Sequence, residues 1–420
     1  MLDAKFIRDN QAVVRKAAAD KGVDFDVDAV VRLADQVRDA QVKVDEGQRL
    51  RREISNQFRG SDPTKQAELR AQAAANDETL KADRAVLAEL RLILDDLLLL
   101  APNIPWQGAP IGASEEDNVV IRSWGEPRQF GFEVKDHVEL LELRGWADFE
   151  NARKASGDRA YALKGVAVRL ERAIHSLALD LLSARDFEIV SVPVIVGREA
   201  LVGTGFLPGH GEEIYRFDRE DAYLAGTAEV GLVGMSSNQI IDGRDLPRLY
   251  AGISPCFRRE VGSASRDVRG LIRVHQFEKV EQFVICEADP EQSARWHAQL
   301  LATAEAILQM LELPYEVVET CTGDMGLGKY RMNDINTWFP SLGIYRETHS
   351  CSTLHDWQAR RANIRYRDSE GTVRYAHTLN NTAVATPRLL AALIENHQQA
   401  DASVAIPEAL RQYVGGHEAL

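Results

Sequence analysis

One stretch in the second half of the chain, residues 255–283, limits the possible folds most strongly. It reads PCFRREVGSASRDVRGLIRVHQFEKVEQF. Two runs able to form strands flank a charged loop rich in Gly and Ser, which predicts a long β-hairpin and not a helix pair. Because side chains alternate across a strand, Arg258 and Glu260 would share one face of the first strand. One face of the second strand would carry Arg273, His275, Phe277, Lys279 and Glu281.

This predicted face is too highly charged to pack only on a hydrophobic core. An aromatic ring, an arginine fork and a carboxylate on one surface suit a nucleotide base, a phosphate and an amine. A solvated edge hairpin is the alternative, because runs of charge usually face water. The stretch alone leaves both interpretations open.

The residues of this hairpin resemble the second signature motif of class II aminoacyl-tRNA synthetases, and the wording is similar to the seryl-tRNA synthetase family. The resemblance depends on residues 257–260 (FRRE) and 269–279 (RGLIRVHQFEK). It implies an α+β fold, with a class II antiparallel sheet flanked by helices and preceded by an N-terminal antiparallel coiled-coil helical hairpin.

The N-terminal region carries two apolar stripes with heptad spacing. The first is Val30, Leu33, Val37, Ala40, Val44, Ile54 and Phe58, and the second is Leu69, Ala73, Leu80, Leu87, Leu90, Leu94 and Leu97. Between them, Asp62 and Pro63 form a good N-cap and first-turn pair. The pattern predicts two long helices in an antiparallel coiled-coil hairpin, about 42 Å from residue 30 to residue 58 at 1.5 Å per residue.

The end of this predicted hairpin is basic. Residues 48–70 contain six Lys or Arg and three Asp or Glu, a net charge of +3 in a chain of −14. A coil that dimerises is the alternative, but the hairpin can bury its stripe against itself. A basic rod could lie along a phosphate backbone without reading bases. The resemblance implies binding of the long variable arm of tRNA(Ser), with contacts from Arg49, Arg51, Arg52 and Arg59.

Residues 101–130 are rich in Pro, Gly and acidic residues and predict a domain boundary. We expect an N-terminal tRNA-binding domain over residues 1–105 and a catalytic domain over residues 106–420. Residues 166–182 predict an amphipathic helix, and residues 187–195 predict a buried strand with Pro193 at an edge or bulge. This helix and strand resemble the first class II motif, which implies a homodimer.

Composition favours a cytoplasmic protein. The four cysteines are widely separated and form no CxxC pair, as in proteins with reduced thiols. The N-terminus lacks the apolar core of a signal peptide, and the most apolar run, residues 90–100, is too short for the roughly 20 residues of a membrane span. The net charge of −14 argues against a nucleic-acid partner. Net charge is only an average, however, and a local basic patch can still bind nucleic acid.

Residues 227–229 (TAE) follow an apparent strand end. A hydroxyl and a carboxylate two residues apart in a strand would point the same way and could hold an ammonium group, although a turn-forming Thr is the alternative. By resemblance, Thr227, Ala228 and Glu229 belong to the serine-binding loop.

Residues 323–329 (GDMGLGK) fit the P-loop pattern up to its last position. Tyr330 stands where a Ser or Thr would bind magnesium, and the following residues alternate like a strand. We therefore reject a P-loop, and the resemblance makes this turn a connecting element.

Two further segments predict phosphate and metal contacts. Glu347 and Ser350 follow an apparent strand, and their oxygens suit Mg²⁺, with a capped turn as the alternative. Thr386 and Pro387 predict a helix start, with Arg388 in its first turn, where an anion is well placed. By resemblance, the first segment binds ATP and its magnesium and the second is the third class II motif. Asn336 departs from the family, in which an acidic residue is common.

The resemblance implies a serine–tRNA ligase that forms seryl-adenylate from L-serine and ATP and transfers serine to tRNA(Ser), and also to a selenocysteine tRNA where one exists. Arg258 and Arg388 would be the catalytic residues. Glu281, Glu229 and Thr382 would bind serine, together with Thr227, Ala228 and Arg258. The implied ATP site comprises Arg258, Arg259, Glu260, Val274, Phe277, Glu347, Thr348, His349, Ser350 and Arg388.

Other functions predict different sequences. A ligase that loads a carrier protein would lack or shorten the hairpin, and a regulator without activity would have lost Arg258, Arg388 or Glu347. All of these features are present.

Overall fold

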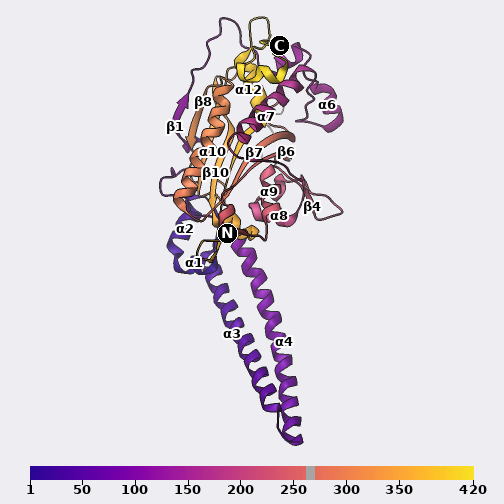
Figure 1. Ribbon diagram of the computed structural model, residues 1–420, viewed down its shortest axis with the longest axis vertical. Helices are drawn as coiled ribbons and strands as arrows, with labels where there is room; N and C mark the ends of the chain where they lie inside the picture. The colour runs from indigo at the N-terminus through magenta and orange to yellow at the C-terminus, as the bar shows by residue number, and fades with distance from the viewer. Residues whose placement is uncertain (262–269) are drawn as a thin grey trace. The chain divides into compact units, whose positions relative to one another are not determined.

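The computed structural model describes residues 1–261 and 270–420, so the predicted loop at 262–269 lies outside the described residues. The chain forms two compact units, one of residues 1–19 and 23–102 and the other of residues 20–22 and 103–420 (Figure 1). Within the two described ranges, no helix is long and apolar enough to cross a membrane.

Four helices form the first unit: α1 (Ala4–Asp9), α2 (Gln11–Asp20), α3 (Val27–Phe58) and α4 (Pro63–Leu99). The carboxylate of Asp62 accepts a hydrogen bond of 2.9 Å from the backbone N–H of Lys65, and Pro63 opens α4. This cap reverses the chain, as the sequence predicts, and α3 and α4 pack as an antiparallel hairpin.

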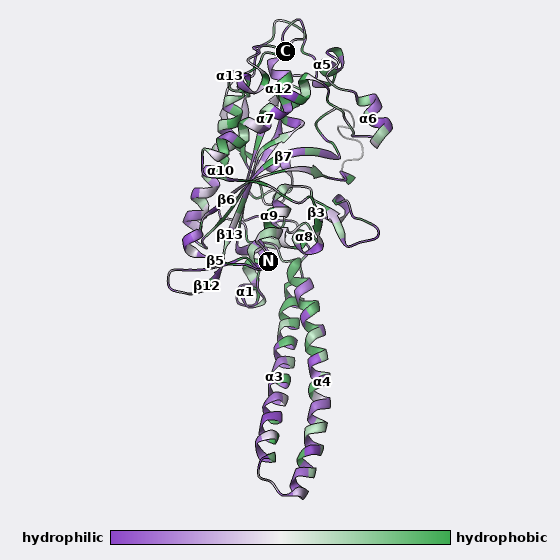
Figure 2. Ribbon diagram, turned by 45° about the vertical axis from the view of Figure 1, so that its right-hand side comes forward, coloured by the Kyte–Doolittle hydropathy of each residue, from purple (hydrophilic) through white to green (hydrophobic). Residues whose placement is uncertain are grey.

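The hairpin buries its own apolar stripe. Ala40 and Val44 on α3 form one buried cluster with Leu80 and Leu87 on α4. Gly47 interrupts the stripe where Leu80 approaches closely, since a Cβ at this position would lie 3.1 Å from its Cδ1. The side-chain amide of Asn76 donates to the carbonyl of Gly47 at 3.1 Å. Hydrophilic residues increase toward the loop that joins the helices (Figure 2).

The second unit contains an eight-stranded sheet. Its strands, in sheet order, are β1 (Val119–Trp124), β8 (Tyr315–Glu319), β9 (Arg331–Phe339), β10 (Ile344–His355), β13 (His377–Thr386), β7 (Gln276–Cys286), β6 (Arg248–Phe257) and β2 (Glu188–Ser191). Neighbours pair antiparallel except β2 and β6, which are parallel. The predicted α+β fold with a mostly antiparallel sheet is therefore confirmed.

Helices cover the two faces of this sheet differently (Figure 1). On one face, Val280 and Val284 of β7 join a large core with α7 (Val166–Ser183), α10 (Pro290–Met310) and α12 (Arg388–His397).

On the opposite face, Phe283 and Ile285 pack in a smaller cluster with α9 (Ala228–Ser236) and α11 (Asp356–Ala362). Phe277, Lys279 and Glu281 continue along this second face, because every second residue of β7 points the same way.

Shorter elements complete the unit. They are α5 (His137–Leu143), α6 (Phe149–Ser156), β3 (Ile195–Gly197), α8 (Arg198–Thr204), β4 (Ala222–Leu224), β5 (Ile240–Asp242), β11 (Arg365–Arg367), β12 (Val373–Tyr375) and α13 (Glu408–Arg411). β3 pairs with β4, and β5, β11 and β12 form a three-stranded sheet.

One prediction about a strand is wrong. Residues 187–195 do not form one buried strand, because β2 ends at Ser191 and β3 belongs to another sheet. β2 is a largely exposed edge strand, and Pro193 lies between the two strands. The segment of residues 101–130, in which a domain boundary is predicted, contains β1, which pairs with β8.

The predicted hairpin exists as β6 and β7, but its strands are shorter than predicted. β6 ends at Phe257 and β7 begins at Gln276, so Arg258, Glu260 and Arg273 lie outside both strands. Glu260 has φ of 53°, a left-handed conformation that a strand does not accommodate. The alternation predicted for these residues is therefore wrong.

Candidate active site

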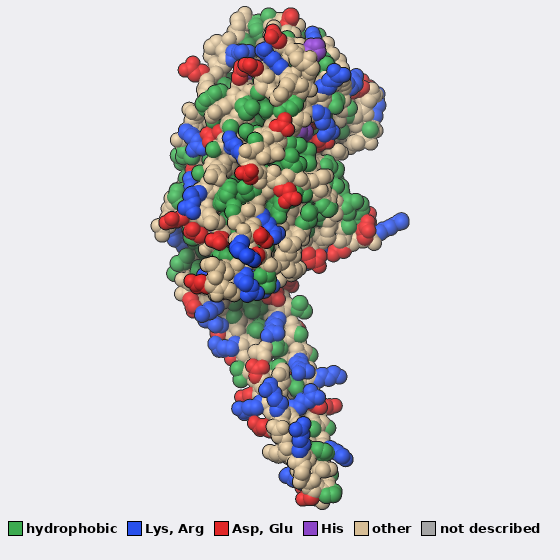
Figure 3. Space-filling view, viewed as in Figure 1, with side chains coloured by type: hydrophobic (Ala, Val, Ile, Leu, Met, Phe, Trp, Pro, Cys, Tyr) green, Lys and Arg blue, Asp and Glu red, His purple; other side chains and the backbone are tan. Residues whose placement is uncertain are grey.

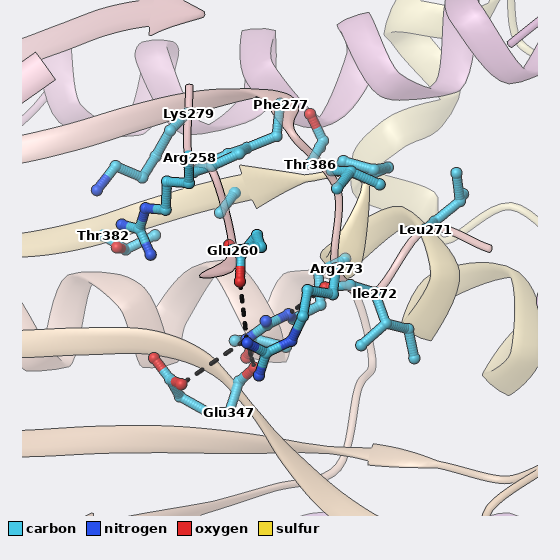
Figure 4. Close-up of a pocket in the computed structure, with 15 residues that line it drawn as sticks. Arg258, Glu260, Leu271, Ile272, Arg273, Phe277, Lys279, Glu347, Thr382 and Thr386 are labelled. Carbon is cyan, nitrogen blue, oxygen red and sulfur yellow. Dashed lines mark hydrogen bonds and ion pairs between the residues drawn. The ribbon is translucent and has the colours of Figure 1, made fainter. Parts of the chain in front are cut away.

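A cavity of about 200 Å³ lies at the end of β6 and β7, on the face of the sheet that carries Phe277 (Figure 4). Its walls come from β7, β10, β13, the start of α12 and the segments next to the undescribed loop. The lining residues are Arg258, Glu260, Leu271, Ile272, Arg273, Val274, Phe277, Lys279, Glu347, Thr348, Thr382, Ala385, Thr386, Pro387 and Arg388.

Arg258 and Arg388, which are 130 positions apart in sequence, line this same cavity. The guanidinium of Arg258 lies over the Phe277 ring, 5.3 Å from its centroid. Arg388 donates from Nε to the carbonyl of Ile272 at 3.1 Å and from Nη1 to the carbonyl of Glu347 at 2.6 Å. The two hydrogen bonds hold Arg388, and the contact with the Phe277 ring holds Arg258, at the same cavity.

The cavity is strongly cationic. Burial lowers the pKa of Arg388, and Arg258, Arg346 and Arg273 lower it further, while Glu347 opposes them. The Glu347 carboxylate lies 3.7 Å from Nη1 of Arg388. Three arginines and one lysine line the cavity with two carboxylates, and this excess of positive charge can be neutralised by an anion such as a polyphosphate.

Glu260 and Arg273 form an ion pair of 2.9 Å inside the cavity (Figure 4). The left-handed backbone at Glu260 turns its carboxylate toward the returning segment, from which Arg273 and Val274 project. This pair joins the two sides of the predicted hairpin beyond the ends of its strands.

A buried polar row continues from the cavity along the sheet. Thr382 on β13 lies opposite Glu281 on β7, and Gly252 on β6 faces Glu281 from the other side. Glu281 forms a buried ion pair of 2.5 Å with Lys279. Burial raises the pKa of Glu281, and Lys279 opposes this change.

Residues 227–229 follow the end of β4 at Leu224, as predicted, but they start α9, so the prediction that the Thr227 and Glu229 side chains point the same way from a strand is wrong. Thr227 caps α9, and its hydroxyl accepts a hydrogen bond of 3.3 Å from the backbone N–H of Glu229. The Glu229 carboxylate accepts hydrogen bonds from Asn380 at 2.6 Å and from Gln358 at 2.8 Å. With Ala228, these residues are buried and lie outside the lining of the 200 Å³ cavity.

The prediction that Glu347 and Ser350 lie at a strand end is wrong, because both residues are inside β10. The register of β10 against β9 shifts between Glu347 and His349. In a regular strand, two residues three positions apart point to opposite faces. The extra residue of the bulge lets Glu347 and Ser350 point to the same face. The two oxygen-bearing side chains fit Mg²⁺ in chemistry, because hard cations prefer oxygen ligands.

Three other residues predicted to bind ATP are Thr348, His349 and Arg259. His349 is buried, with Nδ1 at 2.8 Å from the Thr348 hydroxyl and Nε2 at 3.1 Å from the carbonyl of Ala383. Thr348 lines the cavity but its hydroxyl is 2.7 Å from that of Thr337. The Arg259 side chain is exposed. Neither Arg259 nor His349 lines the cavity.

The start of α12 also differs from the prediction. Arg388 is its first residue, but the N-cap is Pro387 and no side chain caps the helix. The Thr386 hydroxyl instead donates to the carbonyl of Glu278 at 3.3 Å and lies 3.0 Å from Nε2 of His175. Thr386 therefore ties the third motif to β7 and α7.

Sequence reasoning missed three groups near the site. Asn380 lies two residues before Thr382 on β13, so strand alternation alone could have placed both side chains on one face. Alternation along the strand predicts the correct face for Lys279 but indicates no role for it. The buried Asp334 has no local sequence signal, because only the pairing of β9 with β10 brings it opposite Ser350.

The outer half of the α3–α4 hairpin is a second candidate surface, with exposed basic side chains (Figure 3). Arg49, Arg51, Arg52 and Arg59 are all exposed. Two of them are close to acidic residues, Arg49 to Glu53 at 3.6 Å and Arg51 to Asp77 at 3.3 Å. Exposed pairs of this kind are weak and leave the arginines able to contact phosphates.

The antiparallel sheet and its arginine-lined cavity define a class II aminoacyl-tRNA synthetase. The family model of the class II tRNA synthetase core domain (G, H, P, S and T) matches residues 215–397, and the seryl-tRNA synthetase N-terminal domain matches residues 1–105. The chain is 48% identical to the serine–tRNA ligase of Deinococcus radiodurans, covering 100% of this chain and 99% of the relative.

Two solved structures are similar over the whole chain. A seryl-tRNA synthetase from Pyrococcus horikoshii complexed with ATP has a TM-score of 0.92 and 38% identity, covering 100% of this chain and 99% of the other. A cytoplasmic serine–tRNA ligase from Naegleria fowleri in complex with AMP has a TM-score of 0.88 and 29% identity, covering 100% and 98%. This chain belongs to the seryl-tRNA synthetase family.

Proposed function

We propose that this protein is a serine–tRNA ligase that activates L-serine with ATP and then transfers it to tRNA(Ser). The observation that carries the proposal is the position of Arg258 and Arg388 in one cavity beside the buried Glu281. The two arginines suit a polyphosphate, and the buried carboxylate suits a small amino acid with an ammonium group and a hydroxyl.

In the first step, a carboxylate oxygen of serine attacks the α-phosphorus of ATP, and pyrophosphate leaves. Arg258 binds the serine carboxylate and the α-phosphate together and stabilises the charge that develops between them. Phe277 stacks on adenine, with Glu260 and Val274 at its edge, and Arg388 binds the γ-phosphate. Because both reactants are held in place, no side chain needs to act as a nucleophile.

Glu347 and Ser350 would hold the Mg²⁺ that accompanies ATP. When bound, this cation neutralises the charge of the β- and γ-phosphates. The Glu347 carboxylate contributes a charged ligand, and the Ser350 hydroxyl contributes a neutral one.

In the second step, a hydroxyl of the terminal ribose of tRNA attacks the seryl carbonyl carbon. The ester bond forms, AMP leaves, and the hydroxyl proton is lost to solvent. The exposed arginines of the α3–α4 hairpin bind the tRNA backbone through phosphate contacts, which are sensitive to salt.

Selection of serine depends on its hydroxyl. Glu281 and Thr382 lie opposite each other and bind the hydroxyl, while Glu281 and Glu229 hold the ammonium group. Alanine would leave these buried polar groups unpaired, and this penalty gives strong discrimination. Threonine is excluded by size.

The alternative ligase, which loads a carrier protein, is not favoured. Such an enzyme would not need the long hairpin, whereas residues 1–105 of this chain match the N-terminal domain of the family. We further propose that the protein works in the cytoplasm as a homodimer.

Two assays test the proposal. Purified protein is expected to exchange pyrophosphate into ATP with serine alone, and to charge serine-accepting tRNA. Deletion of residues 30–97 is expected to abolish charging and to leave exchange largely intact, because the phosphate contacts of the hairpin serve only the second step. Loss of both activities would show instead that the hairpin supports the catalytic unit, and exchange with alanine but not serine would refute the function.

A further inference from the structure

The mechanism above does not use Asp334, although it lies one strand away from the proposed cation ligands. Its side chain is 6% exposed, and its Oδ1 has no hydrogen-bond partner among the described residues. A buried carboxylate oxygen without a partner is costly, because water no longer solvates it. An unpaired oxygen such as Oδ1 of Asp334 indicates a bonding partner that arrives with the substrate.

Strand register places Asp334 next to the proposed cation ligands. Asp334 on β9 pairs with Ser350 on β10, and Asn336, two residues further on β9, pairs with Glu347. Residues directly opposite in an antiparallel pair have side chains on the same face. The β10 bulge brings Glu347 and Ser350 to a common face, so the three oxygen-bearing side chains share one surface.

Asp334, Asn336 and Glu347 also line a second cavity, of about 560 Å³. This cavity shares Arg273, Glu347 and Arg388 with the 200 Å³ cavity. Asp334 therefore lies beside the site at which the β- and γ-phosphates are proposed to bind.

The arrangement around Asp334 favours a cation. The carboxylates of Glu347 and Asp324 line the same 560 Å³ cavity as Asp334, whose Oδ1 is buried without a hydrogen-bond partner among the described residues. Carboxylates close together repel one another unless a positive charge lies between them.

We propose that Asp334 is a further protein ligand of the divalent cation that accompanies ATP, acting together with Glu347 and Ser350. The inference rests on the proposed function of those two residues. Asp334 thereby supplies the acidic group that Asn336 does not, two residues away on β9 and on the same face.

Binding of Mn²⁺ in the presence of a non-hydrolysable ATP analogue tests this role directly. Electron paramagnetic resonance measures free Mn²⁺ and so gives the dissociation constant without any turnover. We expect Asp334→Asn to weaken Mn²⁺ binding at least tenfold, because the amide removes one anionic ligand without changing the shape of the side chain. Affinity for the analogue in the absence of metal should change less than twofold.

Asp324→Asn is the matched control. Asp324 lines the same 560 Å³ cavity, but its carboxylate accepts a hydrogen bond of 2.8 Å from Asn118, so its charge already has a partner. This variant should bind Mn²⁺ within twofold of the wild type. Equal weakening by both variants would show that the general field of the cavity, and not ligation by Asp334, attracts the cation, and would overturn the proposal.

Glu347→Gln separates the inference from the function on which it rests. If Glu347→Gln weakens Mn²⁺ binding and Asp334→Asn does not, the inference is wrong and the proposed cation site stands. If neither variant weakens binding, the proposed cation site is itself wrong. Circular dichroism checks folding, and Asp334→Ser, which leaves room for water beside Ser350, replaces the Asn variant if that variant does not fold.

Discussion

At the scale of single residues, local irregularities of the backbone decide which side chains meet in the site. The bulge after Glu347 turns this residue and Ser350 to one face of β10. The left-handed conformation of Glu260 directs its carboxylate to Arg273. A second register shift on β13, between Thr382 and Val384, follows the residue that faces Glu281. A regular strand would separate groups that these irregularities bring together.

His137 is another residue whose effect is local. Its Nε2 accepts a hydrogen bond of 3.1 Å from the backbone N–H of Leu271, and its Nδ1 donates to the carboxylate of Glu395 at 2.8 Å. The next carbonyl, that of Ile272, accepts from Arg388 at the start of α12. Since Glu395 is also on α12, this helix holds two consecutive residues of the returning segment.

We expect His137→Ala to raise the KM for ATP roughly tenfold, about 1.4 kcal/mol of binding free energy. The segment that carries Leu271 and Ile272 loses one of its two attachments and no longer holds Arg388 firmly. His137→Gln, whose amide can still accept a hydrogen bond, should recover part of the loss. Pyrophosphate exchange at varied ATP measures the effect.

Leu143→Ala is the control for His137, because Leu143 is on the same helix, α5, and is 63% exposed. It should leave the KM for ATP unchanged. An increase in the KM for serine as large as that for ATP would argue against a role of His137 at the phosphate end of the site.

At the scale of elements, the α3–α4 hairpin is held by its own seam. Leu80 is 2% exposed and packs against Ala40 and Val44 across the hairpin. Apolar burial in this seam, and not helix propensity alone, keeps helices of this length paired. The basic outer half depends on that pairing for its shape.

Leu80→Ala should destabilise the hairpin by about 2 to 5 kcal/mol, the usual cost of removing a buried leucine side chain. We expect an earlier unfolding transition in far-ultraviolet circular dichroism and reduced tRNA charging, with normal pyrophosphate exchange. Tryptophan fluorescence should not change, because all six tryptophans belong to the second unit.

Leu92→Ala provides the comparison, since Leu92 is on α4 but is 69% exposed. Its unfolding transition should match that of the wild type. Similar losses in the two variants would mean that helix content, and not the seam, determines the stability of the hairpin.

At the scale of the whole molecule, buried histidines make stability depend on pH. Burial is the main cause that lowers the pKa of five of them, in each case to about 4: His175, His297, His349, His355 and His377. All ten histidines belong to the second unit. The folded state keeps these five neutral at a pH at which the unfolded chain, with a histidine pKa of about 6.5, binds protons.

Stability of the second unit should therefore be greatest above pH 6.5 and fall as the pH is lowered toward 4. Between these values the unfolded state binds more protons, so each histidine lowers the unfolding free energy by up to about 1.4 kcal/mol per pH unit. Denaturant unfolding followed by tryptophan fluorescence at pH 7.5, 6 and 5 measures the slope. His297→Asn should reduce it, and a flat profile would contradict the buried neutral state.

Much of the architecture could be predicted from short-range patterns. The heptad stripes and the Asp62–Pro63 cap predicted α3, α4 and their reversal, because these features depend on neighbours within one or two turns. Alternation along β7 placed Phe277, Lys279 and Glu281 on one face, and a predicted helix start placed Arg388 in a first turn.

Other features depended on partners far away in the sequence. The pairing of β9 with β10 sets the bulge that orients Glu347 and Ser350 and places Asp334 beside them. Contacts with β7 and α7 occupy the Thr386 hydroxyl, which local reasoning assigned to a cap. The sequence by itself determined the helical hairpin, the β6–β7 hairpin and the residue types of the site, because periodicity and capping are local. Only the tertiary structure decided which polar groups share one surface, because strand register and bulges arise between segments that lie far apart in the sequence.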